Sequence, residues 1–80
     1  MKLRTLLIDD EASARSRLAK LLTAHPEIEI VGAAADGVVA LEQIEQTKPD
    51  LIFLDVQMPG LTGFELLRAL PTPLPLVIFE

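Results

Sequence analysis

The feature that most constrains the fold is an alternation of short apolar runs with amphipathic segments. The runs "LRTLLID", "IEIVGAAA", "DLIFLD" and "PLVIF" have the length and apolar content of strands in a buried sheet. The segments between them carry apolar residues at helical spacing. Strands and helices that alternate through short connections form a parallel sheet with right-handed crossovers. We therefore expect an α/β fold of order β-α-β-α-β-α-β, with helices on both faces of the sheet.

Three helices are expected between these strands. The first spans residues 11–25 and ends before Pro26. The second begins after Asp36-Gly37 and ends near Lys48. The third covers residues 62–71, where Thr62-Gly63-Phe64-Glu65 fits a capping box. The residues expected to face the sheet are Ala14, Leu18, Leu21 and Leu22 in the first helix and Val38, Leu41 and Ile44 in the second.

The acidic residues fall at the ends of the two most apolar strands, which we expect to be neighbours at the centre of the sheet. The less apolar run at residues 28–35 suits an edge. Asp9 and Asp10 close the first strand, and Asp55 closes the third. Open parallel sheets bind ligands outside the carboxyl ends of their strands, where the strand order reverses. Because neighbouring strands lie about 4.8 Å apart, the three carboxylates are expected to converge there.

Three converging carboxylates repel one another, so at neutral pH they must take up a proton or share a cation. Mg²⁺ suits such a site, because it is a hard ion that accepts one or two carboxylates together with waters and a phosphate oxygen. A carboxylate beside bound Mg²⁺ is also a competent nucleophile towards phosphorus, because the metal offsets the charge repulsion. The pattern therefore favours phosphoryl transfer to an aspartate.

The composition narrows the class of protein further. Eighty residues fit one small domain, and 7 basic against 12 acidic residues give a net charge of −5. An acidic surface argues against direct nucleic-acid binding by this segment. There is no cysteine, so a disulfide framework or thiolate metal site is excluded. The start of the chain is no signal peptide and no run approaches membrane-spanning length, so we expect a soluble, cytoplasmic protein.

The motifs "LLIDDE", "IVGAAADGVVALEQI", "KPDLIFLDVQMPGLTGFELL" and "PLVIF" resemble the receiver (CheY-like) domain of bacterial two-component response regulators. The resemblance covers nearly the whole chain and implies the flavodoxin-like receiver fold. The runs "LRTLLIDDE", "LIFLDVQMPG" and "VIF" are most similar to receivers attached to LytTR-type DNA-binding domains.

The resemblance also assigns roles to individual residues. Asp55 is the implied phosphoacceptor, Asp9 and Asp10 are the implied Mg²⁺ acids, and Gln57 is expected to give a backbone carbonyl to the metal. The implied phosphoryl donor is a histidine kinase, and the implied role is that of a regulatory domain rather than an enzyme. The output, expected to be transcription regulation, would reside in another domain.

The family pattern also contains parts that these 80 residues do not include. A receiver has five βα units, with a Ser or Thr at the end of the fourth strand and a Lys at the end of the fifth. The chain ends at Glu80, within the run that corresponds to the fourth strand. The resemblance therefore implies that residues 1–80 are a single truncated receiver domain, in which phosphorylation is slow or absent.

Alternatives remain open at this point. Asp10 could serve only as the N-cap of the first helix. Arg15, Arg17 and Lys20 are expected to be a solvated face, although in the family a kinase docks on this helix. A haloacid-dehalogenase-like phosphatase also uses an aspartate after an apolar strand, but it needs a second aspartate where this chain has Gln57.

The remaining alternative is a fragment that does not signal and only self-associates. An uncovered sheet edge recruits other chains, so we expect a homo-oligomer. Its contacts would involve residues 74–80 and the side of the first helix that carries Leu18 and Leu22.

Overall fold

The computed structural model describes residues 2–55, 65, 68 and 76–79 of the chain. The elements, in chain order, are β1 (Leu3–Ile8), α1 (Ala12–Leu22), β2 (Ile28–Ala34), α2 (Gly37–Thr47), β3 (Leu51–Leu54) and β4 (Leu76–Phe79). Each strand lies inside the run that predicted it and ends within one residue of the predicted bounds. The predicted third helix falls for the most part outside the described residues, although Glu65 and Arg68 are both helical.

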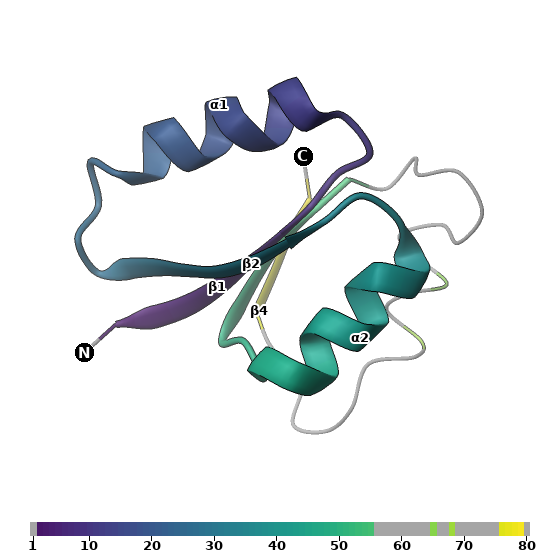
Figure 1. Cartoon of the computed structure of the whole chain (residues 1–80). Helices are drawn as coiled ribbons and strands as arrows, with labels where there is room; N and C mark the ends of the chain where they lie inside the picture. Colours follow the sequence, from purple (N-terminus) through teal and green to yellow (C-terminus); the bar gives the residue numbers. More distant parts are fainter. Residues whose placement is uncertain (1, 56–64, 66–67, 69–75, 80) are drawn as a thin grey trace.

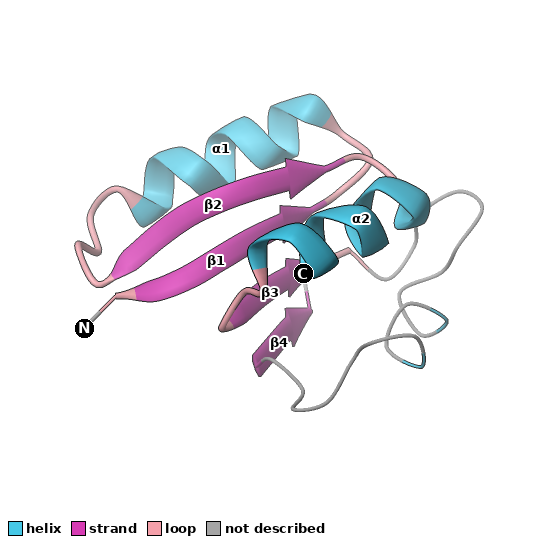
Figure 2. Cartoon of the chain, turned by 60° about the horizontal axis from the view of Figure 1, so that its bottom comes forward, coloured by secondary structure: helices cyan, strands magenta, loops and turns pink. Residues whose placement is uncertain are grey.

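The four strands form one parallel sheet in the order β2-β1-β3-β4 (Figure 2). The two most apolar runs are neighbours at its centre, and β2 is at an edge of the described strands, as predicted. At the carboxyl end of β1, Ile8 pairs with Ala34 on one side and with Leu54 on the other. The chain moves from β1 to one neighbour and returns to the opposite one, so the strand order reverses at β1.

The register of β1 and β3 is fixed at the opposite end of the sheet by Asp50. Its side-chain oxygen Oδ2 accepts a hydrogen bond from the backbone N–H of Arg4, at 2.9 Å. Its own N–H donates to the carbonyl of Arg4, at 2.7 Å, and its carbonyl accepts from the N–H of Leu76, at 3.0 Å. Asp50 therefore joins β1, β3 and β4. By fixing the register, it also sets which residues of β1 and β3 lie side by side at the carboxyl ends of these strands.

Helices α1 and α2 lie on opposite faces of the sheet, as expected for right-handed crossovers (Figure 1). The main core fills the space between α2 and the sheet and is formed by side chains that alternate along the strands. Its buried members are Leu6, Ile8, Ala34, Ala40, Ile44, Ile52 and Leu54, with Leu41 and Val77 packed against them. No helix among the described residues has the length and apolar character needed to cross a membrane.

Helix α2 begins at a side-chain cap and approaches the sheet closely. Asp36 is the N-cap, and its Oδ1 accepts a hydrogen bond from the N–H of Val39, at 2.9 Å. The buried residues of α2 are Gly37, Ala40 and Ile44. The prediction that Val38 faces the sheet is wrong, because its side chain is 67% exposed. Two small residues thus form much of the contact, which lets the helix axis lie near the strands.

Helix α1 is shorter than predicted and ends at Leu22 rather than at residue 25. The hydroxyl of Thr23 donates to the carbonyl of Lys20, at 2.6 Å, and the next residues form a tighter turn in which His25 donates to Leu22. Pro26 disfavours helical geometry at His25, so a helix through residue 25 is excluded. Leu22 is buried as expected, whereas Leu21 is 65% exposed and does not face the sheet.

Candidate functional site

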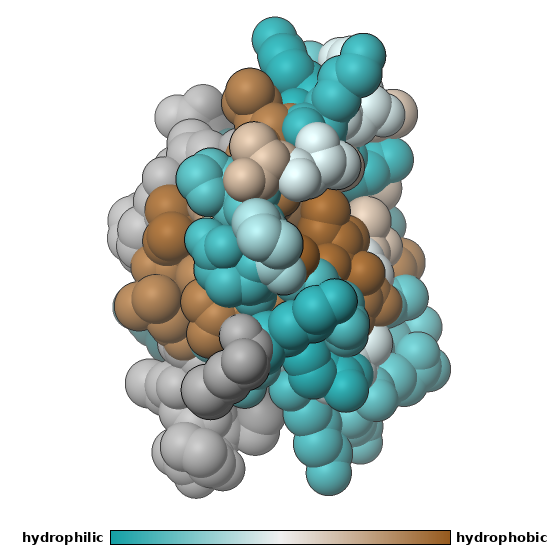
Figure 3. All heavy atoms as spheres, turned by 90° about the vertical axis from the view of Figure 1, so that its left-hand side faces the viewer, coloured by the Kyte–Doolittle hydropathy of each residue, from teal (hydrophilic) through white to brown (hydrophobic). Residues whose placement is uncertain are grey.

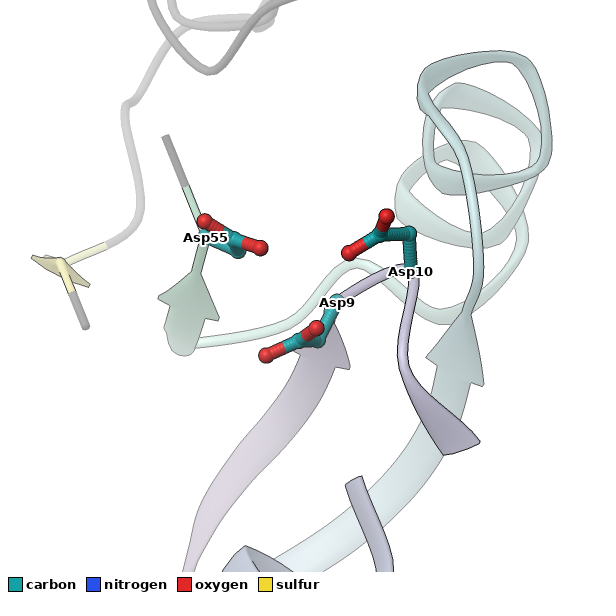
Figure 4. A group of neighbouring side chains, drawn as sticks. All are labelled: Asp9, Asp10 and Asp55. Atoms are coloured by element: carbon teal, nitrogen blue, oxygen red, sulfur yellow. The ribbon is translucent and has the colours of Figure 1, made fainter. Parts of the chain in front are cut away.

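The structure brings together the three aspartates that the sequence singled out. One carboxylate oxygen from each of Asp9, Asp10 and Asp55 lies within 4.8 Å of the other two. Figure 4 shows the three side chains directed into one space, with Asp55 facing Asp9 and Asp10 across it. Gln57, the fourth predicted metal ligand, lies outside the described residues. We call these three aspartates the acid cluster.

The sheet itself positions the acid cluster. The N–H of Asp9 donates to the carbonyl of Ala34, at 3.0 Å, and the N–H of Asp55 donates to the carbonyl of Ile8, at 2.9 Å. These bonds continue the two ladders of β1 for one residue beyond the strand ends. The cluster therefore lies at the carboxyl end of β1, at the point where the strand order reverses.

The three carboxylates differ in their surroundings. Asp9 is 7% exposed, and its Oδ1 accepts a hydrogen bond from the N–H of Glu11, at 2.9 Å. Its backbone carbonyl accepts a second bond from Nη1 of Arg15, at 2.7 Å. Asp55 is half-buried and Asp10 is exposed. The cluster thus has a fixed, buried side at Asp9 and an accessible side at Asp10 and Asp55.

The alternative in which Asp10 is only a helix cap does not fit the structure. The N-cap of α1 is Glu11, whose side chain makes no capping hydrogen bond. Asp10 lies one residue before the cap and extends its carboxylate toward Asp55 (Figure 4). Its position is therefore explained by the cluster and not by the start of the helix.

The donor set of the acid cluster fits a hard divalent cation. All three groups offer carboxylate oxygens, which Mg²⁺ prefers over nitrogen or sulfur. A spacing of up to 4.8 Å suits an ion that keeps some of its waters and takes one or two carboxylates directly. Binding such an ion would offset most of the mutual repulsion of three negative charges, which is the electrostatic reason for such a site to hold a cation.

Arg15 is the residue that the sequence interpretation missed. The helical pattern grouped it with Arg17 and Lys20 on a solvated face, but Arg15 is half-buried and its guanidinium contacts Asp9. A sequence signal existed, because a cation in the first turn of a helix opposes the helix dipole and so calls for a compensating contact.

Fold and site together define the class of protein. A parallel sheet with helices on both faces, and a ligand site at the carboxyl end of its central strands, is the flavodoxin-like α/β class. The family model of the response regulator receiver domain matches residues 5–79. The chain therefore belongs to the response regulator receiver domain family.

Individual relatives agree with this assignment. An uncharacterized response regulatory protein of Vibrio cholerae is 49% identical over 78 residues, which is 96% of this chain and 33% of that protein. A protein-glutamate methylesterase/protein-glutamine glutaminase of Alkalilimnicola ehrlichii is 43% identical over 77 residues, covering 91% of this chain and 20% of that protein. The chain thus spans a third or less of these relatives.

Solved structures show the same fold. The response regulator domain of Thermotoga maritima CheB matches with a TM-score of 0.89 and 36% identity, over 99% of this chain and 60% of that one. The receiver domain of the putative response regulator NarL from Mycobacterium tuberculosis matches with a TM-score of 0.87 and 34% identity, over 98% of this chain and 64% of that one. The predicted receiver fold is confirmed.

Proposed function

We propose that the chain is a phosphoacceptor receiver domain, in which Asp55 takes a phosphoryl group from a histidine kinase in a Mg²⁺-dependent reaction. The observation that carries the proposal is the convergence of Asp9, Asp10 and Asp55 within 4.8 Å. Because the chain belongs to the receiver family, the phosphoryl donor is proposed to be a histidine kinase. In this proposal the signal passes to an output outside residues 1–80.

Each residue of the site has a separate task in the proposed reaction. Asp9 and Asp10 would hold Mg²⁺ together with Asp55 and the backbone carbonyl that the family resemblance assigns to Gln57. When bound, Mg²⁺ offsets the charge repulsion between carboxylate and phosphoryl group. A carboxylate oxygen of Asp55 forms the new bond to phosphorus, and the bond from phosphorus to the histidine nitrogen breaks. The released imidazole keeps the electron pair and takes up a proton.

The half-buried position of Asp55 supports its role as the acceptor. Its backbone N–H is held by the carbonyl of Ile8 at 2.9 Å, so the side chain starts from a fixed point at the sheet edge. Asp9 is too enclosed to meet an incoming phosphohistidine, because only 7% of it is exposed. Asp10 is exposed but follows β1 into the turn before α1. The arrangement favours Asp55 as the nucleophile.

The surface next to the acid cluster supports docking of a kinase. Helix α1 starts two residues after Asp10, and it carries Arg15, Arg17 and Lys20 without any acidic residue. A basic helix on a chain of net charge −5 presents a local positive surface to an acidic partner. We place the reaction in the cytoplasm and the output in transcription regulation through a further domain.

Acetyl phosphate labelling tests the proposed acceptor. The chain is incubated with acetyl phosphate and Mg²⁺, and its intact mass is followed over a time course. We expect slow, Mg²⁺-dependent addition of one phosphoryl group, which Asp55→Asn abolishes. Asp36→Asn is the matched control, because asparagine also caps a helix and Asp36 belongs to α2. Label that persists in Asp55→Asn, or label that appears equally fast without Mg²⁺, would refute the proposal.

A further inference from the structure

We propose that Arg15 is a positioning residue for the acid cluster, and that its guanidinium fixes the Asp9–Asp10 peptide in the orientation that metal binding requires. This inference rests on the proposed function, because it assigns a new residue to the same metal site. It concerns a side chain that contributes no ligand atom and belongs to a helix rather than to the strand ends.

The contact between Arg15 and Asp9 is direct. Nη1 of Arg15 donates to the backbone carbonyl of Asp9 at 2.7 Å, in a part-buried position. The backbone N–H of Arg15 donates to the carbonyl of Glu11 at 3.1 Å, which is the first hydrogen bond of α1. Arg15 is therefore anchored in the first turn of the helix while its side chain reaches back to the end of β1.

This bond completes the fixation of Asp9. Its N–H is held by Ala34, at 3.0 Å, and its Oδ1 by the N–H of Glu11, at 2.9 Å. The carbonyl held by Arg15 belongs to the peptide group that joins Asp9 to Asp10. A peptide group is planar, so fixing its oxygen also fixes the direction in which the chain enters Asp10. Arg15 thereby orients both acids that precede α1.

The electrostatics of α1 argue that Arg15 is at this position for a specific reason. A cation in the first turn of a helix is disfavoured by the positive end of the helix dipole. The first turn contains no acidic residue, and the N-cap Glu11 makes no side-chain cap bond that would offset this. Arg17 and Lys20 lie further along α1 and are exposed. The bond to the Asp9 carbonyl and the nearby carboxylates offset the unfavourable interaction of Arg15 with the helix dipole.

Arg15 affects metal affinity in two opposite ways. The direction in which a substitution changes the affinity therefore shows which effect is larger. Its positive charge repels a cation, and removing the charge alone would tighten metal binding. Its hydrogen bond orders the ligands, and losing that bond would weaken metal binding. Groups that orient metal ligands are worth roughly 10-fold to 100-fold in affinity. A single partly solvated charge changes metal affinity by less than this. We therefore expect a substitution of Arg15 to weaken metal binding, because the loss of ligand order outweighs the loss of charge repulsion.

Mn²⁺ binding, measured by water proton relaxation, decides between these effects. We expect Arg15→Met to weaken Mn²⁺ binding about 10-fold. Arg15→Lys keeps the charge and one donor, so it should recover part of the affinity. The control is Arg17→Met, which removes the same charge from an exposed position on the same helix. Unchanged or tighter binding in Arg15→Met, or equal weakening in Arg17→Met, would overturn the proposal.

A second measurement does not depend on metal. The N–H of Glu11 is bonded to Oδ1 of Asp9, so its hydrogen exchange in metal-free protein reports the order of the loop. We expect faster exchange at Glu11 in Arg15→Met and not in Arg17→Met, with Arg15→Lys as the substitute should Arg15→Met fail to fold. Unaltered exchange contradicts the positioning role. Altered exchange in a chain that binds no Mn²⁺ refutes the proposed metal site while leaving the loop contact in place.

Discussion

The three aspartates of the acid cluster are not equivalent, because each carboxylate has a different freedom to move. Asp9 is bonded through its N–H, its carbonyl and Oδ1, so its remaining oxygen is presented in one direction. Asp10 is exposed, and Asp55 is half-buried on the opposite strand. A cation would therefore meet one rigid ligand and two that adjust. Such a division lowers the ordering cost of binding without closing the site to a phosphoryl donor.

The first prediction at this scale concerns the metal ligands. Asp9→Asn and Asp55→Asn should each weaken Mn²⁺ binding by at least 10-fold, because each removes a charge and a carboxylate oxygen from the cluster. Titration calorimetry measures the effect. Asp50→Asn serves as the control, because that residue joins strands at the opposite end of the sheet. Affinity that is unchanged in both Asp9→Asn and Asp55→Asn would remove the metal assignment.

Sequence reasoning found the acidic residues of the site but not their support. The acids were predictable because a charge that ends a buried apolar run needs a partner, and because parallel strands end at one edge. Arg15 was assigned to the solvated face instead, because its contact depends on a side chain that folds back across the helix start to a carbonyl. Helical periodicity reports which way a residue faces, and it does not report how far a long side chain reaches.

At the scale of elements, a side chain of α2 packs closely on β2 at Gly32. A Cβ added at Gly32 would lie 2.5 Å from Oε1 of Gln43 and 3.1 Å from Cδ1 of Leu6. Gln43 belongs to α2 and Leu6 to β1, so Gly32 lies between a helix and the central strand. The space that a Cβ would fill at Gly32 is therefore occupied by the end of the Gln43 side chain.

The prediction at this scale is that the effect of Gly32→Ala depends on Gln43. In the parent chain we expect a loss of no more than about 1 kcal/mol in the free energy of unfolding, because the amide end of Gln43 can move aside but loses its packing, and Leu6 Cδ1 must also shift slightly. In a Gln43→Ala background most of the clash is gone, so the same change should be neutral or stabilising. Urea unfolding of the four chains in this cycle measures the coupling. Identical effects in both backgrounds would contradict the packing described.

The helix faces were harder to predict than the strands for a related reason. A strand buried on both faces needs only an apolar run, so β1 and β3 were placed within one residue. For α2 the pattern favoured the large side chain of Val38, whereas the sheet accepts Gly37 and Ala40. Which side of a helix is buried depends on the shape of the surface it meets. That surface is produced by other segments and is not encoded in the helix itself.

At the scale of the whole molecule, the described residues include several large apolar side chains that are exposed. Figure 3 shows apolar side chains gathered across the middle of one face, with hydrophilic ones above and below. Leu76 and Ile78 of β4 are 63% and 41% exposed. They alternate with Val77, which packs against the core on the α2 side, so they lie on the opposite face of the sheet. Apolar patches on edge strands recruit other chains.

The prediction at this scale is self-association through β4. Sedimentation of the chain at micromolar concentration should show a dimer or larger species, and Ile78→Lys should shift it toward monomer because a charge is then buried on association. Val38→Lys is the control, since Val38 is also an exposed β-branched apolar residue but belongs to α2. The predicted contribution of Leu22 needs correction, because Leu22 is buried and the exposed leucine of α1 is Leu21. A compact monomer at all concentrations would exclude association.

The position of β1 between β2 and β3 determines when the acid cluster can form during folding. Asp9 and Asp55 come together only after the chain has passed through α1, β2 and α2 and returned to pair Ile8 with Leu54. No local turn or hairpin brings them close, so the unfolded chain offers a cation no equivalent site. An ion held by the cluster would therefore bind the native state alone and raise its stability by mass action. Closing such a long loop is also slow compared with forming a helix. The rate at which the chain binds the ion during refolding would therefore report the rate at which β3 pairs with β1.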